Sequence, residues 1–302
     1  MGSKISALVL VSGGLDSLLA AKLLKEEGIK VKGLVFTSAF FDGRAGQIGC
    51  KQLGIECRIV DFSSEHLEIV KRPCFGRGRA ANPCIDCHLL MLKKAKEILN
   101  KEGYDFVVTG EVLGERPLSQ NKRALELIAK ESGLGGYLLR PLSAKLLPVT
   151  LAEKKGWVSQ KALLSISGRR RQPQMDLAKK LGLTKYLQPS GGCILTEKNY
   201  GRKLLEIFVH WPDCQVIDVQ LLRLGRLFWR KETLIVLGRN HEENQQLEQV
   251  KQTGDLLILP KNFPGPTALI RGRRTNLKKT TEQLILKHSQ PVDKPKFLTY
   301  VV

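Results

Sequence analysis

The residues best suited to chemistry near the start of the chain form a glycine-rich loop, residues 12–17 (SGGLDS). Its two glycines let backbone N–H groups approach phosphate oxygens closely, and a helix that starts here adds the positive end of its dipole. Asp16 would repel phosphate unless a cation lay between them, so it indicates Mg²⁺. The simpler alternative is a tight turn with Asp16 as an ordinary acidic residue of a helix. We expect the phosphates to lie against Ser12, Gly13, Gly14, Asp16 and Ser17.

A second group combines two cysteines and a histidine in residues 84–88 (CIDCH), and Cys193 follows in a Gly-Gly-Cys turn more than 100 residues later. Cysteines that cluster in a reduced chain indicate metal binding or sulfur chemistry. The letters match the c-type haem signature, but that attachment requires an exported protein, which nothing here indicates. Two interpretations remain for this pair: a redox pair at the start of a helix, and a zinc site with Cys74, His88 or Cys193 as a further ligand.

Length and composition limit the class of protein. The 302 residues suit two modest domains, and the 42% hydrophobic and 26% charged content is typical of soluble globular proteins. No apolar run approaches the roughly 18 residues that a membrane span needs. We therefore predict a cytoplasmic protein with reduced cysteines and no membrane partner. Cys50, Cys57 and Cys214 fit apolar patterns, and we expect them to be small buried residues.

The segments around these groups alternate between strand and helix patterns. An apolar run, Ile5–Val11, ends at the glycine loop, and Asp16–Glu27 has helical apolar spacing. Further strands are predicted at Val31–Phe36, Cys57–Asp61, Asp105–Thr109 and Tyr137–Leu139, further helices at Gln47–Leu53, Leu89–Lys101 and Asn121–Glu131, and a loop at residues 71–87. This order predicts an α/β fold with a doubly wound parallel sheet. Gly110 would then follow a strand at the edge where nucleotides bind.

The pattern changes after about Lys203, and we predict two domains, residues 1–204 and 205–302. The second reads as a smaller α+β domain. Its predicted strands are Leu221–Trp229, Thr233–Leu237, Asp255–Leu259 and Thr267–Ile270, its single predicted helix is Glu242–Lys251, and residues 291–296 are predicted to be a loose connector.

A net charge of +20 indicates a polyanionic partner, most often nucleic acid. The charge is concentrated in the basic segment, residues 140–186, where eleven lysines and arginines face only Glu153 and Asp176. The alternative is a charged surface that serves only solubility. Predicted RNA contacts are Arg169, Arg170, Arg171, Arg239, Arg271, Arg273 and Arg274.

The SGGLDS loop after an apolar strand resembles the PP-loop, or N-type ATP pyrophosphatase, family. The resemblance covers roughly residues 1–200 and extends through residues 109–111 (TGE) and 140–142 (RPL). Members bind the pyrophosphate of ATP and transfer AMP to a carbonyl oxygen of their substrate. The resemblance therefore implies ATP and Mg²⁺ as cofactors, with Asp16 and Gly110 at the nucleotide.

Residues 82–87 (NPCIDC) with a later Cys193 resemble the tRNA-thiolating branch of that family, which includes the 2-thiouridine and 4-thiouridine synthetases. Some members hold a 4Fe–4S iron–sulfur cluster through a CxxC and one distant cysteine, and others use a two-cysteine persulfide relay. The resemblance implies Cys84, Cys87 and Cys193 as cluster ligands, or one of the CxxC pair with Cys193 as the sulfur relay. The chain departs from the branch in showing neither the N-terminal RNA-binding module nor the C-terminal β-barrel of those enzymes.

Residues 236–244 (VLGRNHEEN) and 263–266 (FPGP) resemble the NFACT RNA-binding domain over about 60 residues. With this domain the leading prediction is ATP-dependent thiolation of a tRNA uridine, with tRNA and a sulfur donor (a desulfurase, a carrier protein or sulfide) as partners. A homodimer is left open. The alternatives are another PP-loop adenylation or amidation of a carbonyl substrate, and a non-catalytic RNA-binding protein that holds ATP and zinc.

Overall fold

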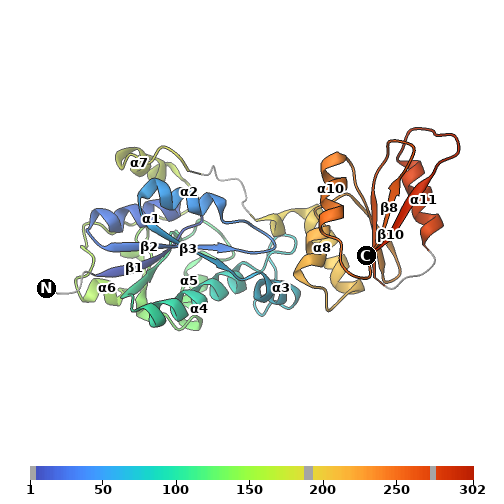
Figure 1. Ribbon diagram of the computed structural model, residues 1–302. Helices are drawn as coiled ribbons and strands as arrows, with labels where there is room; N and C mark the ends of the chain where they lie inside the picture. Colours follow the sequence, from blue (N-terminus) through green and yellow to red (C-terminus); the bar gives the residue numbers. More distant parts are fainter. Residues whose placement is uncertain (1–4, 187–192, 273–276) are drawn as a thin grey trace. The chain divides into compact units, whose positions relative to one another are not determined.

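The computed structural model describes residues 5–186, 193–272 and 277–302, and the chain divides into two compact units, residues 1–197 and 198–302 (Figure 1). The predicted boundary at residues 204/205 falls inside helix α8 (Lys198–His210). The sequence hides this boundary because α8 carries lysine and arginine residues like the basic segment before it. No helix within the described ranges combines the length and apolar character needed to cross a membrane.

The first unit contains the doubly wound parallel sheet that the sequence predicts. Its strand order is β3-β2-β1-β4-β5, and every pairing is parallel. The strands are β1 (Ser6–Leu10), β2 (Lys30–Thr37), β3 (Glu56–Asp61), β4 (Phe106–Val108) and β5 (Leu138–Leu139). The order reverses between β1 and β4, and the crevice at the carboxyl ends of such a pair is where open α/β sheets bind ligands.

Helices cover both faces of this sheet (Figure 1). They are α1 (Leu15–Glu26), α2 (Arg44–Leu53), α3 (Ser63–Lys71), α4 (Cys84–Glu102), α5 (Lys122–Glu131), α6 (Leu151–Lys154) and α7 (Gln172–Lys180). Along β1, Ala7 and Val9 belong to a core with α1, α2 and α7, whereas Leu8 belongs to a second core with α4 and α5. Burial on both faces explains why β1 reads as a continuous apolar run.

Two parts of the first unit differ from the prediction. The predicted loop 71–87 ends at Pro83, because α4 begins at Cys84 rather than Leu89 and is 19 residues long. Both residues of the CxxC therefore lie in the first turn of a long helix. Helix α3 was not predicted, since its nine residues have a short and weakly apolar face.

The second unit is an α+β domain with an antiparallel sheet of strand order β10-β8-β9-β7-β6. Its strands are β6 (Arg226–Arg230), β7 (Thr233–Leu237), β8 (Leu256–Pro260), β9 (Ala268–Gly272) and β10 (Phe297–Val301), and its helices are α8, α9 (Val216–Leu221), α10 (His241–Gln249) and α11 (Lys278–Lys287). The prediction of one helix was wrong, and the strand predicted from Leu221 begins only at Arg226 because a capped helix, α9, precedes it. Strand β10 was not predicted.

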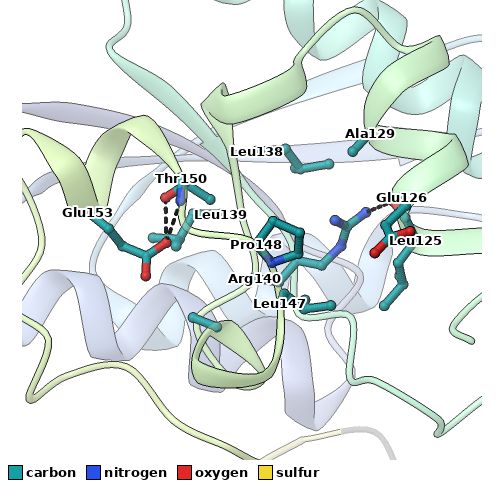
Figure 2. A pocket seen from close by; sticks show the side chains of 11 residues that line it. Leu125, Glu126, Ala129, Leu138, Leu139, Arg140, Leu147, Pro148, Thr150 and Glu153 are labelled. Atoms are coloured by element: carbon teal, nitrogen blue, oxygen red, sulfur yellow. Dashed lines mark hydrogen bonds between the residues drawn. The ribbon is translucent and has the colours of Figure 1, made fainter. Parts of the chain in front are cut away.

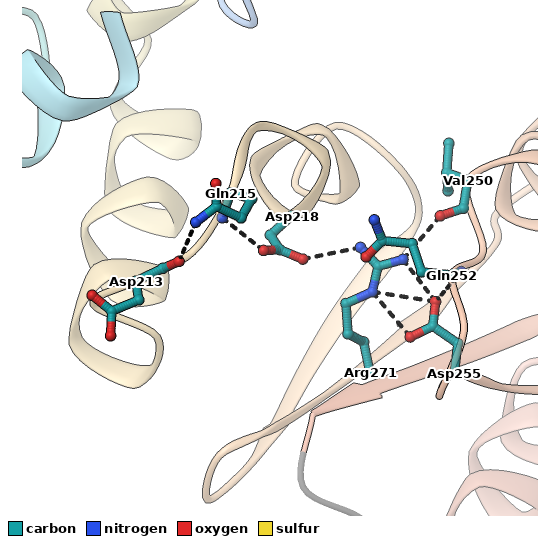
Figure 3. A network of polar contacts seen from close by, with 7 residues as sticks. All are labelled: Asp213, Gln215, Asp218, Val250, Gln252, Asp255 and Arg271. Carbon is teal, nitrogen blue, oxygen red and sulfur yellow. Dashed lines mark hydrogen bonds and ion pairs between the residues drawn. The ribbon is translucent and has the colours of Figure 1, made fainter. Parts of the chain in front are cut away.

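Arg271 on β9 holds the second unit together and is not a surface residue (Figure 3). Its guanidinium lies 2.7 Å from Asp255 and 3.0 Å from Asp218, and it donates to the carbonyl oxygen of Val250 at 2.9 Å. The side chain is 8% exposed. The prediction that Arg271 contacts RNA was therefore wrong, because its guanidinium is buried in ion pairs and hydrogen bonds within the second unit.

We expect Arg271→Ala to destabilise the protein by about 3–5 kcal/mol, since it leaves Asp255 buried without its cation. The measurement is urea-induced unfolding of the full chain. Arg226→Ala on β6 is the control, because Arg226 is exposed, and its effect should stay within about 0.5 kcal/mol. Equal stability of the two variants would contradict a structural role for Arg271.

Candidate nucleotide and cysteine site

The glycine-rich loop joins β1 to α1 at the point where the strand order reverses. Gly13 has a φ of +80°, and a Cβ at this position would overlap the backbone of Ala45 on α2. Within the loop, Ser17 Oγ donates to the carbonyl oxygen of Gly14 at 2.8 Å, and the Gly14 N–H points to Ser12 Oγ at 3.3 Å. No side chain caps the start of α1, so its N–H groups remain available to an anion.

Gly110 brings the end of β4 against this loop. A Cβ on Gly110 would lie 2.5 Å from the backbone of Asp16 and Ser17. Only glycine permits this approach, which joins the two strand ends at the reversal point. Gly110 therefore lies against the glycine-rich loop, and its contact with a nucleotide stays a prediction.

Asp16 lies in a mixed cluster of charges. Arg171 Nη2 is 3.2 Å from Asp16 Oδ2, and Arg171 Nε is 3.7 Å from Glu115. Burial raises the pKa of Asp16, and Arg171 and Arg116 oppose that shift. Arg171 is thus paired at the nucleotide loop, whereas the sequence assigned it to an RNA-binding face. Nothing in the local sequence RRR distinguishes it from Arg169 and Arg170, which are exposed.

A buried network centred on Glu111 links the end of β4 to the start of α4, the helix that carries the CxxC. The Glu111 carboxylate accepts from Arg140 Nε at 2.8 Å and from the Thr109 hydroxyl at 2.9 Å, and it lies 2.7 Å from His88 Nδ1. Burial alone would raise the pKa of Glu111, but Arg140 and His88 hold it well below its usual range. An ionised carboxylate only accepts, so His88 Nδ1 carries the proton and engages Glu111. His88 was considered as a zinc ligand from sequence, and the structure gives it this different partner.

Behind Arg140 lies a pocket of about 170 Å³ (Figure 2). Its wall is mostly apolar, formed by Leu125, Leu138, Leu147 and Pro148, and Arg140 donates to the carbonyl oxygen of Leu125 at 3.2 Å. None of the lining residues belongs to the glycine-rich loop or to the cysteine group. The pocket is therefore separate from the glycine-rich loop and from the three cysteines.

The structure brings Cys84, Cys87 and Cys193 into one neighbourhood. The N–H of Ala81, just before the CxxC, donates to the carbonyl oxygen of Leu195 at 3.1 Å, which places the Cys193 turn beside the start of α4. Burial raises the pKa of Cys87 well above its usual value, and Cys193 and Cys84 raise it further. Burial also raises the pKa of Cys84, against the opposing charge of Arg116. The glycines before Cys193, Gly191 and Gly192, lie outside the described residues.

The other predicted residues separate into three groups. Cys50 and Cys214 are buried as expected, but Cys57 is exposed because β3 is the edge strand of its sheet. Arg239 forms an ion pair with Glu243 on α10 and keeps half of its side chain exposed. Arg273 and Arg274 lie outside the described residues.

The parallel sheet, the uncapped glycine-rich loop and the glycine after β4 are the features that the PP-loop resemblance of the sequence predicts. Residues 5–150 match the family model described as the tRNA methyl transferase HUP domain. The match covers slightly less than half of the chain, and it agrees with the PP-loop resemblance of the sequence.

Curated relatives extend the likeness. The chain is 28% identical over 221 residues to a mitochondrial tRNA-specific 2-thiouridylase of Drosophila melanogaster, covering 65% of this chain and 54% of the relative. It is 32% identical over 148 residues to a probable tRNA sulfurtransferase of Finegoldia magna, covering 48% and 37%. A solved complex of a 4-thiouridine synthetase with RNA and bound ATP has a TM-score of 0.38 at 17% identity, over 61% of this chain and 53% of that one. The chain spans about half the length of the curated 2-thiouridylases that it matches.

The Glu111 network predicts a pH dependence. The folded pKa of Glu111 lies below its unfolded value, so its contribution to stability is complete above the ordinary glutamate range and is lost as the pH falls through the folded value. We expect Glu111→Gln to cost about 3–5 kcal/mol at pH 7, because Arg140 is left buried without its counter-charge. This cost should shrink as the pH falls below about 4.5.

Urea unfolding of both proteins between pH 7 and pH 3.5 measures this difference. Glu131→Gln, at the exposed end of α5, is the control and should cost little at any pH. A cost for Glu111→Gln that does not change with pH would contradict the assignment.

Proposed function

We propose that this protein is an ATP-dependent enzyme that thiolates a uridine of tRNA. Two observations support the proposal: the Cys193 turn lies beside the start of α4, which carries Cys84 and Cys87, and the His88–Glu111 contact ties this helix to the strand end that meets the glycine-rich loop. The names of the relatives, which are tRNA 2-thiouridylases and a probable tRNA sulfurtransferase, support the same reaction.

In the first step, the loop of residues 12–17 holds the phosphates of ATP, and Asp16 would hold a Mg²⁺ ion that neutralises part of their charge. The carbonyl oxygen of the base attacks the α-phosphorus, and pyrophosphate leaves. The product is an O-adenylated base, whose carbon is open to a nucleophile. Positive charge around the loop, from Arg116, Arg171 and the start of α1, stabilises the negative charge that develops on the phosphates.

In the second step, sulfur replaces the oxygen. A cysteine carrying a persulfide attacks the activated carbon with its terminal sulfur, and AMP leaves with the former carbonyl oxygen. A second thiol then attacks the cysteine sulfur of the adduct, so that a disulfide forms and the thiocarbonyl is released. The persulfide sulfur is reduced, two cysteines are oxidised, and a thiol reductant restores them. One residue of the CxxC pair and Cys193 supply the two thiols.

A metal centre at these cysteines was the other prediction. Within residues 5–186, 193–272 and 277–302, no three histidine, cysteine or acidic side chains are arranged to hold a metal ion. No step of the proposed reaction goes through a zinc ion or a 4Fe–4S cluster. Iron and sulfide analysis of protein purified without oxygen decides between the cluster and the relay.

RNA binding is proposed for the basic segment, residues 140–186, where Arg169 and Arg170 are exposed, and for the second unit, where Arg239 is half exposed. The net charge of +20 supports a polyanionic substrate. An NFACT-like role of the second unit rests on the sequence motifs alone. A tRNA substrate would place the reaction in the cytoplasm or an organelle that holds tRNA, with an external sulfur donor.

The test is mass spectrometry of nucleosides in tRNA from cells with and without the protein. Loss of one thiouridine is expected when the protein is absent, with recovery on re-expression. Re-expression of Cys84→Ser, Cys87→Ser or Cys193→Ser should lower recovery for at least Cys193 and one of the pair. Asp16→Asn should reduce pyrophosphate release about 100-fold or more.

Cys57→Ser is the matched control, because Cys57 is an exposed thiol on β3 and is not one of the three cysteines of the proposed sulfur route. This variant should restore full thiolation. Unchanged tRNA nucleosides in the deletion strain, with carbonyl substrates amidated instead, would favour another PP-loop reaction. Thiolation that survives all three cysteine changes would contradict the proposed sulfur route.

A further inference from the structure

The first turn of α7 lies beside the glycine-rich loop, although 155 residues separate Arg171 from Asp16 along the chain. Arg171 is the N-cap of α7, and Gln174 occupies its third position. Helix α7 packs against α1, and the side chain of Arg171 at the N-terminus of α7 reaches Asp16 in the first turn of α1. Arg171 is only 20% exposed, and its closest partner is the Asp16 carboxylate at 3.2 Å.

Several polar atoms in this turn are buried and lack a hydrogen-bond partner within the described part of the chain. They include Arg171 Nε and the amide oxygen of Gln174, whose N–H group faces Asp16, together with Asp16 Oδ1 on α1. Gln174 is completely buried, yet it lies close enough to Asp16 to lower the pKa of that carboxyl. Buried amides nearly always have partners, and an orphaned one costs about 1–3 kcal/mol. This arrangement indicates that a ligand supplies the missing partners.

The charges of the cluster identify the class of that ligand. Two carboxylates, Asp16 and Glu115, lie among two guanidiniums, Arg116 and Arg171. The two carboxylates are like charges that share the Arg171 guanidinium. A bound Mg²⁺ would relieve the carboxylates, and phosphate oxygens would pair with the guanidiniums and the amide N–H. The ligand that carries both is a magnesium polyphosphate.

We infer that Arg171 and Gln174 complete the polyphosphate site from α7. Without nucleotide, Arg171 takes the place of the cation at Asp16. With magnesium ATP bound, Asp16 would hold the Mg²⁺ ion, and the Arg171 guanidinium and the Gln174 amide N–H would pair with the phosphate oxygens. This inference rests on the ATP-binding part of the proposed function, and it removes Arg171 from the RNA-binding face.

Calorimetric titrations without RNA test the inference on the full chain. The probes are magnesium ATP, magnesium pyrophosphate, AMP, and Mg²⁺ alone. Arg171→Met should weaken ATP and pyrophosphate binding about 10- to 100-fold and change AMP binding less than about 3-fold. Mg²⁺ alone should bind this variant more tightly, because Asp16 loses its competing cation. Gln174→Leu should weaken pyrophosphate binding without that gain in Mg²⁺ affinity.

Two controls keep charge and composition matched. Lys179→Ala removes one positive charge from the other end of α7, and Gln172→Ala removes an exposed amide from its first turn. Both should bind ATP and pyrophosphate like the wild type. Arg171→Lys replaces the methionine variant if that variant unfolds. Lysine keeps the positive charge but lacks the bidentate guanidinium, so pyrophosphate binding should fall by an intermediate factor.

Opposite changes in Mg²⁺ and pyrophosphate affinity support the inference, since general damage would weaken both. Wild-type affinities for pyrophosphate in folded Arg171→Met, or in Arg171→Lys when the methionine variant unfolds, would overturn it. If thiolation is absent but these affinities shift as expected, the proposed reaction fails and the phosphate site stands. If wild-type protein thiolates tRNA while Arg171→Met binds pyrophosphate normally, the reaction stands and this inference fails.

Discussion

The carboxylate of Glu111 is the contact on which the arrangement of the site depends. It accepts hydrogen bonds from residues on three separate elements: Thr109 at the end of β4, Arg140 after β5, and His88 in the first turn of α4. Such a buried anion is stable only while its cation and its donors are in place. The nucleotide edge of the sheet and the helix that carries the CxxC are thereby fixed to each other.

Glycine provides the second constraint. At Gly110 the backbone of one strand end meets the backbone of the glycine-rich loop, and no side chain fits between them. This contact places Glu111, the next residue, directly beside the loop. Backbone approach and a buried ion pair thus act together: the first sets the distance between the strands, and the second sets the direction of the cysteine helix.

The sequence predicts those features that local pattern determines. The apolar run at β1, the glycine-rich loop and the helix after it follow from burial on both sheet faces and from backbone freedom. Pattern could not separate Arg171 from Arg170, or Arg271 from its neighbours, because the partners of each arginine lie 16 to 155 residues away. The prediction that Cys57 is buried was wrong for the same reason, since its exposure depends on which strand forms the edge of the sheet. The Glu111 network was visible only as motif residues, whereas its geometry requires the tertiary fold.

The most direct test of the central claim is the stoichiometry of the reaction in a purified system. Protein, unthiolated tRNA, a persulfide donor, a thiol reductant, Mg²⁺ and ATP labelled at the α-phosphate are combined, and AMP, pyrophosphate and sulfur in the RNA are counted together. We expect one AMP and one pyrophosphate for each sulfur atom that enters a uridine. Formation of ADP and phosphate, or AMP without sulfur in the RNA, would contradict the proposed function.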